Sequence, residues 1–251
     1  MLKLSNINVT LSKGTPLHAE ILQNLNLQVG NGEFVIIIGS NGCGKSTMFN
    51  TIAGFIQPDS GAVIIDDSDV TDVKCARRAA LVSLVMQDPR VGTMEHMTIE
   101  ENLSMAYMRG KARGLCLHNT CERRNLFIEK LALLNMNLEN KLDQLVGNLS
   151  GGQRQALSLI MAIIADYKIL LLDEITAALD PSTADNVMAI AAKLVQEEKR
   201  TAIMITHNMH YALTYGNRTL LMNRGKIVRE YDAATRSSLT PAMLAADIGE
   251  I

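Results

Sequence analysis

Residues 39–47, with the sequence GSNGCGKST, have the composition and spacing of a phosphate-binding loop. An apolar run precedes this loop and apolar residues at helical spacing follow it, so we expect a strand, the loop and then a helix. Glycines let backbone N–H groups turn toward phosphates, and the helix N-terminus adds the positive end of its dipole. Lys45 would reach the β- and γ-phosphates of a nucleotide, and the Ser46 hydroxyl would bind Mg²⁺. The predicted nucleotide-binding residues of the loop are Gly39, Ser40, Asn41, Gly42, Cys43, Gly44, Lys45, Ser46 and Thr47.

Three further apolar runs end in polar residues, which are Asp173-Glu174, Gln87 and His207. Asp173 could hold Mg²⁺ through its waters, and Glu174 could accept a proton from the attacking water as general base. Gln87 could contact Mg²⁺ or that water, although a Gln before Asp-Pro is also an ordinary turn residue. His207 could orient the γ-phosphate, although a lone His at a strand end is often structural.

The order of the predicted elements indicates the fold class. Apolar strands alternate with helical patterns, which predicts a mostly parallel sheet with helices on both faces and functional residues at the carboxyl ends of the strands. Residues 1–33 alternate like an antiparallel β-layer. We therefore expect one α/β domain (1–251), in which the core and β-layer take about 1–87 and 166–251 and a helical subdomain takes about 88–165.

Local signals place the helix starts and one hairpin. Thr98 and Ser150 each open a capping box, and Asp180-Pro181 has the form of an N-cap followed by a first-turn proline. Arg224-Gly225 predicts the turn of a hairpin between about 219 and 228.

Composition narrows the class of protein. A net charge of −2 over 251 residues lacks the basic surface that nucleic acid usually demands, so we expect no nucleic-acid partner. The longest strongly apolar stretch, 156–165, is about half of a membrane span, and the N-terminus alternates like a strand rather than a signal peptide. We therefore expect a soluble chain whose role at a membrane depends on a partner. The four cysteines are irregularly spaced, which favours reduced thiols.

The stretch LSGGQ at 149–153 carries a second interpretation besides helix initiation. Its adjacent glycines, Gly151 and Gly152, expose N–H groups that can bind an anion. This stretch, GSNGCGKST at 39–47, Gln87, ILLLDE at 169–174, AALD at 177–180 and TH at 206–207 together resemble the nucleotide-binding subunit of ABC transporters. The resemblance covers essentially the whole chain, with the motifs in the family's order.

The resemblance implies a P-loop NTPase fold: a RecA-like core with an N-terminal antiparallel β-layer and an inserted α-helical subdomain. Two copies would form a head-to-tail homodimer around two ATP molecules, each bound with Mg²⁺. Each ATP would contact the phosphate loop of one copy and the signature residues of the other, and Asp180 would lie at the dimer interface. The signature residues are Ser150, Gly151, Gly152 and Gln153.

The same resemblance implies residue roles. The catalytic residues would be Glu174, His207, Gln87 and Lys45, and the Mg²⁺ ligands would be Ser46, Gln87 and Asp173. ATP-driven closure and hydrolysis would drive an integral membrane permease docked near Gln87 and the helical subdomain. The subunit would be peripheral on the cytoplasmic face of the cell membrane, and an extracytoplasmic solute-binding protein would act with it indirectly.

The motif variants LLLDEITAALDP and THNM look most like ATPases of a bacterial uptake branch associated with aromatic amino acids such as tryptophan and tyrosine. We therefore expect an ATPase that powers uptake of a small solute. The alternatives are an exporter ATPase and a soluble ABC ATPase. Of the soluble types, the cluster-assembly type is the hardest to separate from a transporter, because it also has a single cassette.

Three positions depart from the family pattern or invite another interpretation. Members of the family usually stack an aromatic ring of the N-terminal β-layer on adenine. This chain has no aromatic residue before Phe34, and Leu11 stands at the position where that ring is expected. The replacement predicts weaker ATP affinity or looser base selectivity. Cys43 is either simply small or a thiol whose alkylation blocks nucleotide binding. A cluster of Cys116, His118 and Cys121 fits no strong zinc pattern, so we expect no metal there.

Overall fold

The computed structural model describes residues 1–111, 120–177, 179–197 and 199–249. Its centre is a six-stranded sheet with the order β10-β9-β3-β8-β7-β6. Strands β3, β6, β7, β8 and β9 run parallel to one another, and β10 pairs antiparallel with β9. The mostly parallel sheet and the terminal hairpin are therefore confirmed. The strands are β3 Phe34–Ile38, β6 Val82–Val85, β7 Ile169–Asp173, β8 Thr201–Ile205, β9 Arg218–Asn223 and β10 Lys226–Tyr231.

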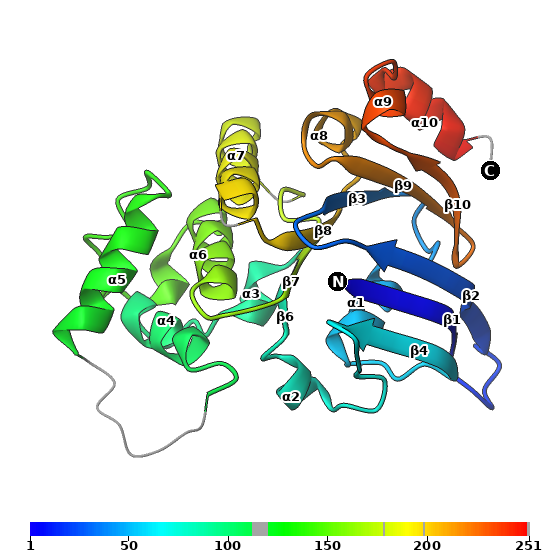
Figure 1. The fold of residues 1–251 in the computed structure, drawn as a ribbon. Helices are drawn as coiled ribbons and strands as arrows, with labels where there is room; N and C mark the ends of the chain where they lie inside the picture. The colour runs from blue at the N-terminus through cyan, green and yellow to red at the C-terminus, as the bar shows by residue number, and fades with distance from the viewer. Residues whose placement is uncertain (112–119, 178, 198, 250–251) are drawn as a thin grey trace.

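A second, antiparallel sheet has the order β2-β1-β4-β5 (Figure 1). Its long strands are β1 (Leu2–Leu11) and β2 (Ala19–Val29), as expected for residues 1–33. The sheet also contains β4 (Ser60–Ile65) and β5 (Ser68–Asp69), which lie after the phosphate loop in the sequence. The β-layer is thus wider than the N-terminal segment alone, because β4 pairs with β1.

Helices are the other regular elements of the described chain. Those between residues 89 and 163 lie together at the left of Figure 1, and a single isolated bridge joins Thr98 to Leu145 there. The division into a core and a helical subdomain at about 88–165 stays a prediction. The helices are α1 Lys45–Ala53, α2 Cys75–Arg78, α3 Pro89–Gly92, α4 Ile99–Tyr107, α5 Cys121–Ala132, the 3₁₀ turn η1 Val146–Asn148, α6 Gly151–Ile163, α7 Pro181–Glu197, α8 Met209–Thr214, α9 Ala233–Arg236 and α10 Pro241–Gly249.

The predicted helix starts are present. Thr98 and Ser150 each form a complete capping box, with Glu101 and Gln153 as the respective partners. Asp180 Oδ1 accepts hydrogen bonds from Thr183 N (3.1 Å) and Ser182 Oγ (2.8 Å) at the start of α7. The short helices α2, α3, α8 and α9 were not predicted, because four to six residues are too few for a periodic pattern.

Two apolar cores lie on the two faces of the central sheet. Along β3 the side chains alternate: Phe34, Ile36 and Ile38 pack with the cluster that contains α6 and α7, whereas Val35 and Ile37 pack with α1 and the antiparallel sheet. All five side chains are buried, which explains why every residue of β3 is apolar. Helices therefore cover one face, and α1 with the antiparallel sheet covers the other. Within the described ranges, no helix is long and apolar enough to cross a membrane.

Arg78 closes the C-terminal end of α1, the helix that follows the phosphate loop. Its side chain is completely buried, and Gly54 leaves room for it, since a Cβ at Gly54 would meet Arg78 Nε at 2.9 Å. A cation at a helix C-terminus also complements the helix dipole. The guanidinium donates to the carbonyl oxygens of Thr51, Ile52, Val70, Thr71 and Val73.

We expect Arg78→Met to lower the free energy of unfolding by about 2–4 kcal/mol, because it leaves several buried carbonyls without a donor. Urea denaturation measures this change. Arg77→Met is the matched control, since Arg77 is its exposed neighbour, and it should cost less than about 0.5 kcal/mol. Equal effects of the two substitutions would contradict the capping role of Arg78.

Candidate active site

The loop between β3 and α1 follows the path that its glycines permit. Gly39, Gly42 and Gly44 have φ angles of +154°, +77° and +105°, which are unfavourable for other residues. A Cβ at Gly39 would also lie 2.2 Å from Met222 O of β9. The loop therefore packs closely on β9 of the central sheet, and α1 begins directly at its end.

Lys45 is almost fully buried at the start of α1. Its ammonium group donates to Gly39 O and Ser40 O, both at 2.9 Å, and lies 3.8 Å from Cys43 Sγ. The carbonyls are neutral, so the cation still makes the loop attractive to phosphate oxygens. Cys43 is itself buried, which limits access of a reagent to its thiol.

The acids predicted from the sequence lie beside this loop. Asp173 is the last residue of β7, and its Oδ1 is buried without a hydrogen-bond partner among the described residues. Burial, together with the charge of Glu174, raises the pKa of Asp173 to about 6, although Ser46, Lys45 and His207 act in the opposite direction. The arrangement thus concentrates negative charge where a cation would be favoured.

Glu174 and His207 face each other across the ends of β7 and β8. His207 Nε2 lies 2.8 Å from Glu174 Oε1, and the Glu174 side chain is 16% exposed against 41% for His207. Glu174 has a φ of +46°, an uncommon conformation for a non-glycine residue, and its N–H donates to Ile205 O. A carboxylate held in this way beside an imidazole can orient and deprotonate a water.

A hollow of about 370 Å³ lies between the phosphate loop, Gln87 and Glu174, whereas Asp173 and His207 are not among its lining residues. It does not include Leu11, which is half-buried at the end of β1; Ile21 of β2 lines it instead. Ile21 was missed because nothing in the sequence distinguishes it from other apolar strand residues. Two larger hollows, of about 580 and 600 Å³, share Asn217 and lie at the start of β3 and β9, away from this loop. The lining residues of the 370 Å³ hollow are Ile21, Asn41, Gly42, Gly44, Lys45, Ser46, Thr47, Gln87 and Glu174.

The signature residues lie elsewhere, on the first turn of α6. Ser150 and Gly151 are exposed, and Gly152 packs against α7, since a Cβ there would lie 2.7 Å from Thr183 Cγ2. Asp180, which caps α7, is therefore a neighbour of the signature turn. Hydrogen bonds from Thr183 and Ser182 lower the pKa of Asp180 to about 2, so this acid is ionised at neutral pH. Ala178, within the predicted 177–180 motif, lies outside the described residues.

The residues at the loop fit a Mg²⁺ ion. Ser46, Gln87 and Asp173 offer a hydroxyl, an amide carbonyl and a carboxylate, which are the oxygen donors that Mg²⁺ prefers. The unpartnered Asp173 Oδ1 is the specific atom that such an ion would satisfy. Of the cysteine–histidine cluster considered above, Cys116 and His118 lie outside the described residues, and Cys121 is exposed at the start of α5.

The family model described as ABC transporter matches residues 22–177. A tyrosine transport ATP-binding protein of Clostridioides difficile (strain R20291) is 41% identical over 242 residues, which cover 96% of this chain and 95% of that protein. This chain belongs to the ABC transporter family. The thiamine import ATP-binding protein ThiQ of Escherichia coli (strain UTI89 / UPEC) is 34% identical over 227 residues, which cover 90% of each chain.

Solved structures agree with this ABC ATPase assignment. The dimeric ATP-binding cassette MJ0796, in a post-hydrolysis state bound to ADP and Pi, is 30% identical with a TM-score of 0.81 and covers 93% of this chain. That match covers 99% of the cassette. A nucleotide-free cassette from an ABC transporter is 25% identical with a TM-score of 0.75, covering 92% of this chain and 91% of its own. The predicted fold class, the ATPase activity and the binding of ATP follow from these matches.

In this ABC ATPase the adenine ring would meet aliphatic rather than aromatic side chains. We expect the dissociation constants for ATP and GTP to differ by less than about tenfold, because base–aromatic stacking, worth roughly 1–3 kcal/mol, is missing. Ile21→Tyr, which places a ring at the hollow, should tighten ATP binding by about five- to a hundredfold, as measured by titration calorimetry. Leu17→Tyr, at a position that is 78% exposed in the loop before β2, is the control and should change nothing. ATP binding far tighter than GTP binding in the unaltered chain would contradict this interpretation.

Proposed function

We propose that this ABC ATPase powers the uptake of a small solute through a separate bacterial permease, and that the solute is an aromatic amino acid. The observation that carries the mechanism is that Lys45, Gln87 and Glu174 line one hollow, with His207 Nε2 2.8 Å from Glu174 Oε1. The solute class is supported by the 41% identity to a tyrosine transport ATP-binding protein, whereas the 34% identity to thiamine import proteins makes thiamine the second candidate.

In the proposed reaction the phosphates of ATP lie on the loop N–H groups, and Lys45 turns from the loop carbonyls to the β- and γ-phosphates. Ser46, Gln87 and Asp173 would hold Mg²⁺, which supplies charge neutralisation to the phosphates when bound. Glu174 accepts the proton of the attacking water, and His207 holds the Glu174 carboxylate in place and contacts the γ-phosphate.

The second half of the ATP site comes from another copy of the chain. Ser150 and Gly151 are exposed at the N-terminus of α6, where backbone N–H groups and a capping serine suit an anion. A two-fold axis would bring this turn and Asp180 against the hollow of the partner copy, and it would do so twice. The dimeric state of the cassette MJ0796 supports such a pairing.

The proposed permease docks beside the hollow. Val91 and Met94 are exposed, at 67% and 48%, in the segment that follows Gln87. Large exposed apolar side chains close together are typical of a protein-binding surface. In this arrangement the ATPase is peripheral on the cytoplasmic face of the membrane, and a solute-binding protein delivers the solute from the other side.

We expect Glu174→Gln to reduce ATP hydrolysis by roughly 10²- to 10⁴-fold, because the amide cannot take the proton, while ATP binding remains. Phosphate release measures the loss, and size-exclusion chromatography with MgATP should show a stable dimer. Glu122→Gln is the control, since Glu122 is exposed on α5 far along the chain from the hollow. A Glu174→Gln protein with near-normal turnover would rule out Glu174 as the base.

We expect the tagged chain, extracted from native membranes in mild detergent, to retain a multi-span permease in stoichiometric yield, as identified by mass spectrometry. Val91→Glu should abolish this retention, because it places a charge in the apolar contact. Val228→Glu is the matched control at another exposed valine, on β10. Recovery of only soluble partners, with ATPase activity intact, would favour the cluster-assembly alternative instead.

A further inference from the structure

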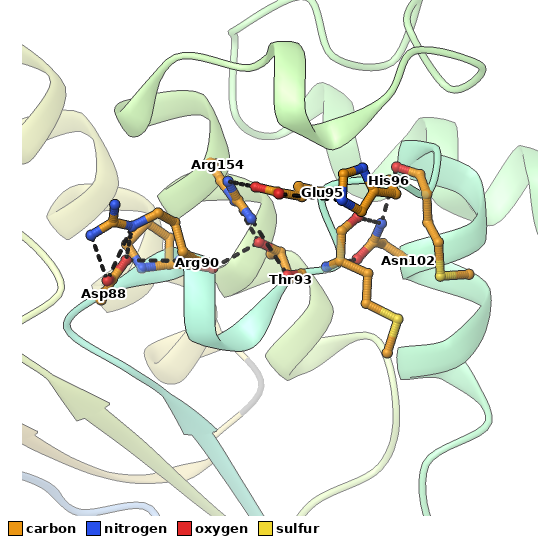
Figure 2. Close-up of polar contacts among 10 residues, drawn as sticks. Asp88, Arg90, Thr93, Glu95, His96, Asn102 and Arg154 are labelled. Atoms are coloured by element: carbon orange, nitrogen blue, oxygen red, sulfur yellow. Dashed lines mark hydrogen bonds and ion pairs between the residues drawn. The ribbon is translucent and has the colours of Figure 1, made fainter.

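The residues between Gln87 and α4 make polar contacts with one another and with Asn102 and Arg154 of the helices (Figure 2). We call residues 88–97 the bridge segment. It begins with Asp88, which caps the short helix α3 by accepting from Arg90 N at 2.9 Å. Within it Val91 and Met94 are exposed, whereas Thr93 is only 6% exposed. Thr93 therefore points inward between two side chains that point outward.

Arg154 meets Thr93 from α6. It follows Gln153 directly, and its N–H donates to Ser150 O in the first helical turn, so its backbone is part of the signature turn. The residue is 8% exposed. Its Nε donates to Thr93 Oγ1 at 2.6 Å, and Thr93 Oγ1 in turn donates to Pro89 O at 2.7 Å. One chain of hydrogen bonds thus runs from the signature turn through Thr93 into α3.

A second group reaches the same guanidinium from the bridge segment. Glu95 Oε2 lies 3.8 Å from Arg154 Nη1, but the Glu95 side chain is 53% exposed, so this ion pair is screened by solvent. The backbone oxygen of Thr93 is 3.5 Å from Nη2, at the limit of a hydrogen bond. The short bond to the Thr93 hydroxyl is therefore the strongest contact that the structure gives this side chain.

Further hydrogen bonds join the bridge segment to α4 and η1. Asn102 of α4 accepts from Met94 N (2.8 Å) and donates to Met94 O (3.0 Å), and Gly147 N of η1 donates to Glu95 O. On the side of the central sheet, Gln155 Nε2 reaches Met86 O at a weaker 3.4 Å. These hydrogen bonds of Met94 and Glu95 to α4 and η1 are thus shorter than the bond between α6 and Met86, which precedes the segment.

We propose that the Arg154–Thr93 contact is a positioning link that makes the bridge segment follow the signature turn of α6. ATP bound against Ser150 of one copy would then be reported to Val91 and Met94 of that same copy. Arg154 and Thr93 touch neither nucleotide nor reacting atoms; they act through the segment that they hold. The inference rests on the proposed function, because it requires ATP to bind at the signature turn of a dimer.

A packing role alone does not explain these residues. A buried guanidinium with few acceptors costs desolvation energy, and an apolar side chain of similar volume would fill the space without that cost. The planar guanidinium of arginine instead donates directional hydrogen bonds, which an apolar side chain cannot make. Loss of the link should therefore uncouple the two segments without unfolding the protein.

The test uses the full chain carrying Glu174→Gln, with hydrogen–deuterium exchange measured with and without MgATP. Peptides that cover 88–97 and 151–163 report the bridge segment and α6 separately. Thr93→Val removes the hydroxyl at nearly constant volume, Arg154→Met removes the link from the other side, and Thr93→Ser keeps the hydroxyl. Ser150→Arg blocks the dimer but keeps the phosphate loop. In this variant any MgATP-dependent change in the exchange of 88–97 must arise within one copy, through Gln87. That change is subtracted from the change measured in the other variants.

The matched control is Thr201→Val. Thr201 is 5% exposed, accepts from Gly32 N at 3.0 Å and donates to Gly30 O. Thr201→Val therefore loses the same kinds of hydrogen bonds as Thr93→Val, but at the first residue of β8, the end away from His207. We expect the ATP-dependent change in 88–97 to fall at least about fivefold in Thr93→Val and in Arg154→Met. The change in 151–163 should persist in both, and Thr93→Ser and Thr201→Val should behave like the parent.

An undiminished change in 88–97 in both Thr93→Val and Arg154→Met, with dimerisation intact, would overturn the link and leave the proposed function standing. Equal loss in Thr201→Val would also overturn it, because the effect would then be one of general stability. If MgATP produced neither a dimer nor a change in either segment of the parent, the proposed function itself would fail, and the link with it.

Discussion

Parallel strand pairing at the centre of the sheet is the constraint on which the site depends. Ile37 of β3 pairs with Ile205 of β8, and Ile205 pairs with Asp173 of β7, so three strand ends lie at one level. The phosphate loop, Glu174 and His207 begin within two residues of that row. Parallel strands need long crossovers, and these crossovers let each strand end carry a different group from a different part of the sequence.

The same row explains the electrostatics of the site. Asp173 is buried beside Glu174, and its pKa of about 6 lies above the ordinary value of 3.8. The folded chain therefore holds this proton more tightly than the unfolded chain does. By linkage, the contribution of Asp173 to folding is most favourable below the ordinary value and falls as the pH rises through about 6. A carboxylate at that position attracts a cation, and a cation that binds the folded chain offsets this cost.

The first turn of α6 contacts two other segments of the chain through residues only two positions apart. The signature turn at the start of α6 packs on α7 through Gly152, and α6 holds the bridge segment through Arg154. An exposed surface that includes Val91 and Met94 is thus tied both to Gln87 at the hollow and to the turn that would bind a second nucleotide. Such short connections between packed elements allow a change at one site to bias another.

The sequence by itself determined the nucleotide chemistry and the order of the main elements. Gly39 to Thr47, the acids after KILLL and the capping box at Ser150 are short-range patterns, and the chemistry or the backbone needs those residue types at those spacings. Long apolar runs such as 34–38 likewise predict buried strands without any knowledge of their neighbours. The buried strand 34–38 and the capping box at Ser150 were confirmed because each depends on residues adjacent in the chain, whereas the roles of the loop residues and the acids stay predictions.

Only the tertiary structure decided which distant residues meet. The pairing of β4 with β1, the place of Ile21 at the hollow, the five carbonyls around Arg78 and the contact of Arg154 with Thr93 all join segments that are separated in the sequence. An arginine after LSGGQ or within CARR has no local pattern that marks it as buried. Its burial depends on carbonyls and hydroxyls that other elements supply, and those partners exist only once the chain has folded.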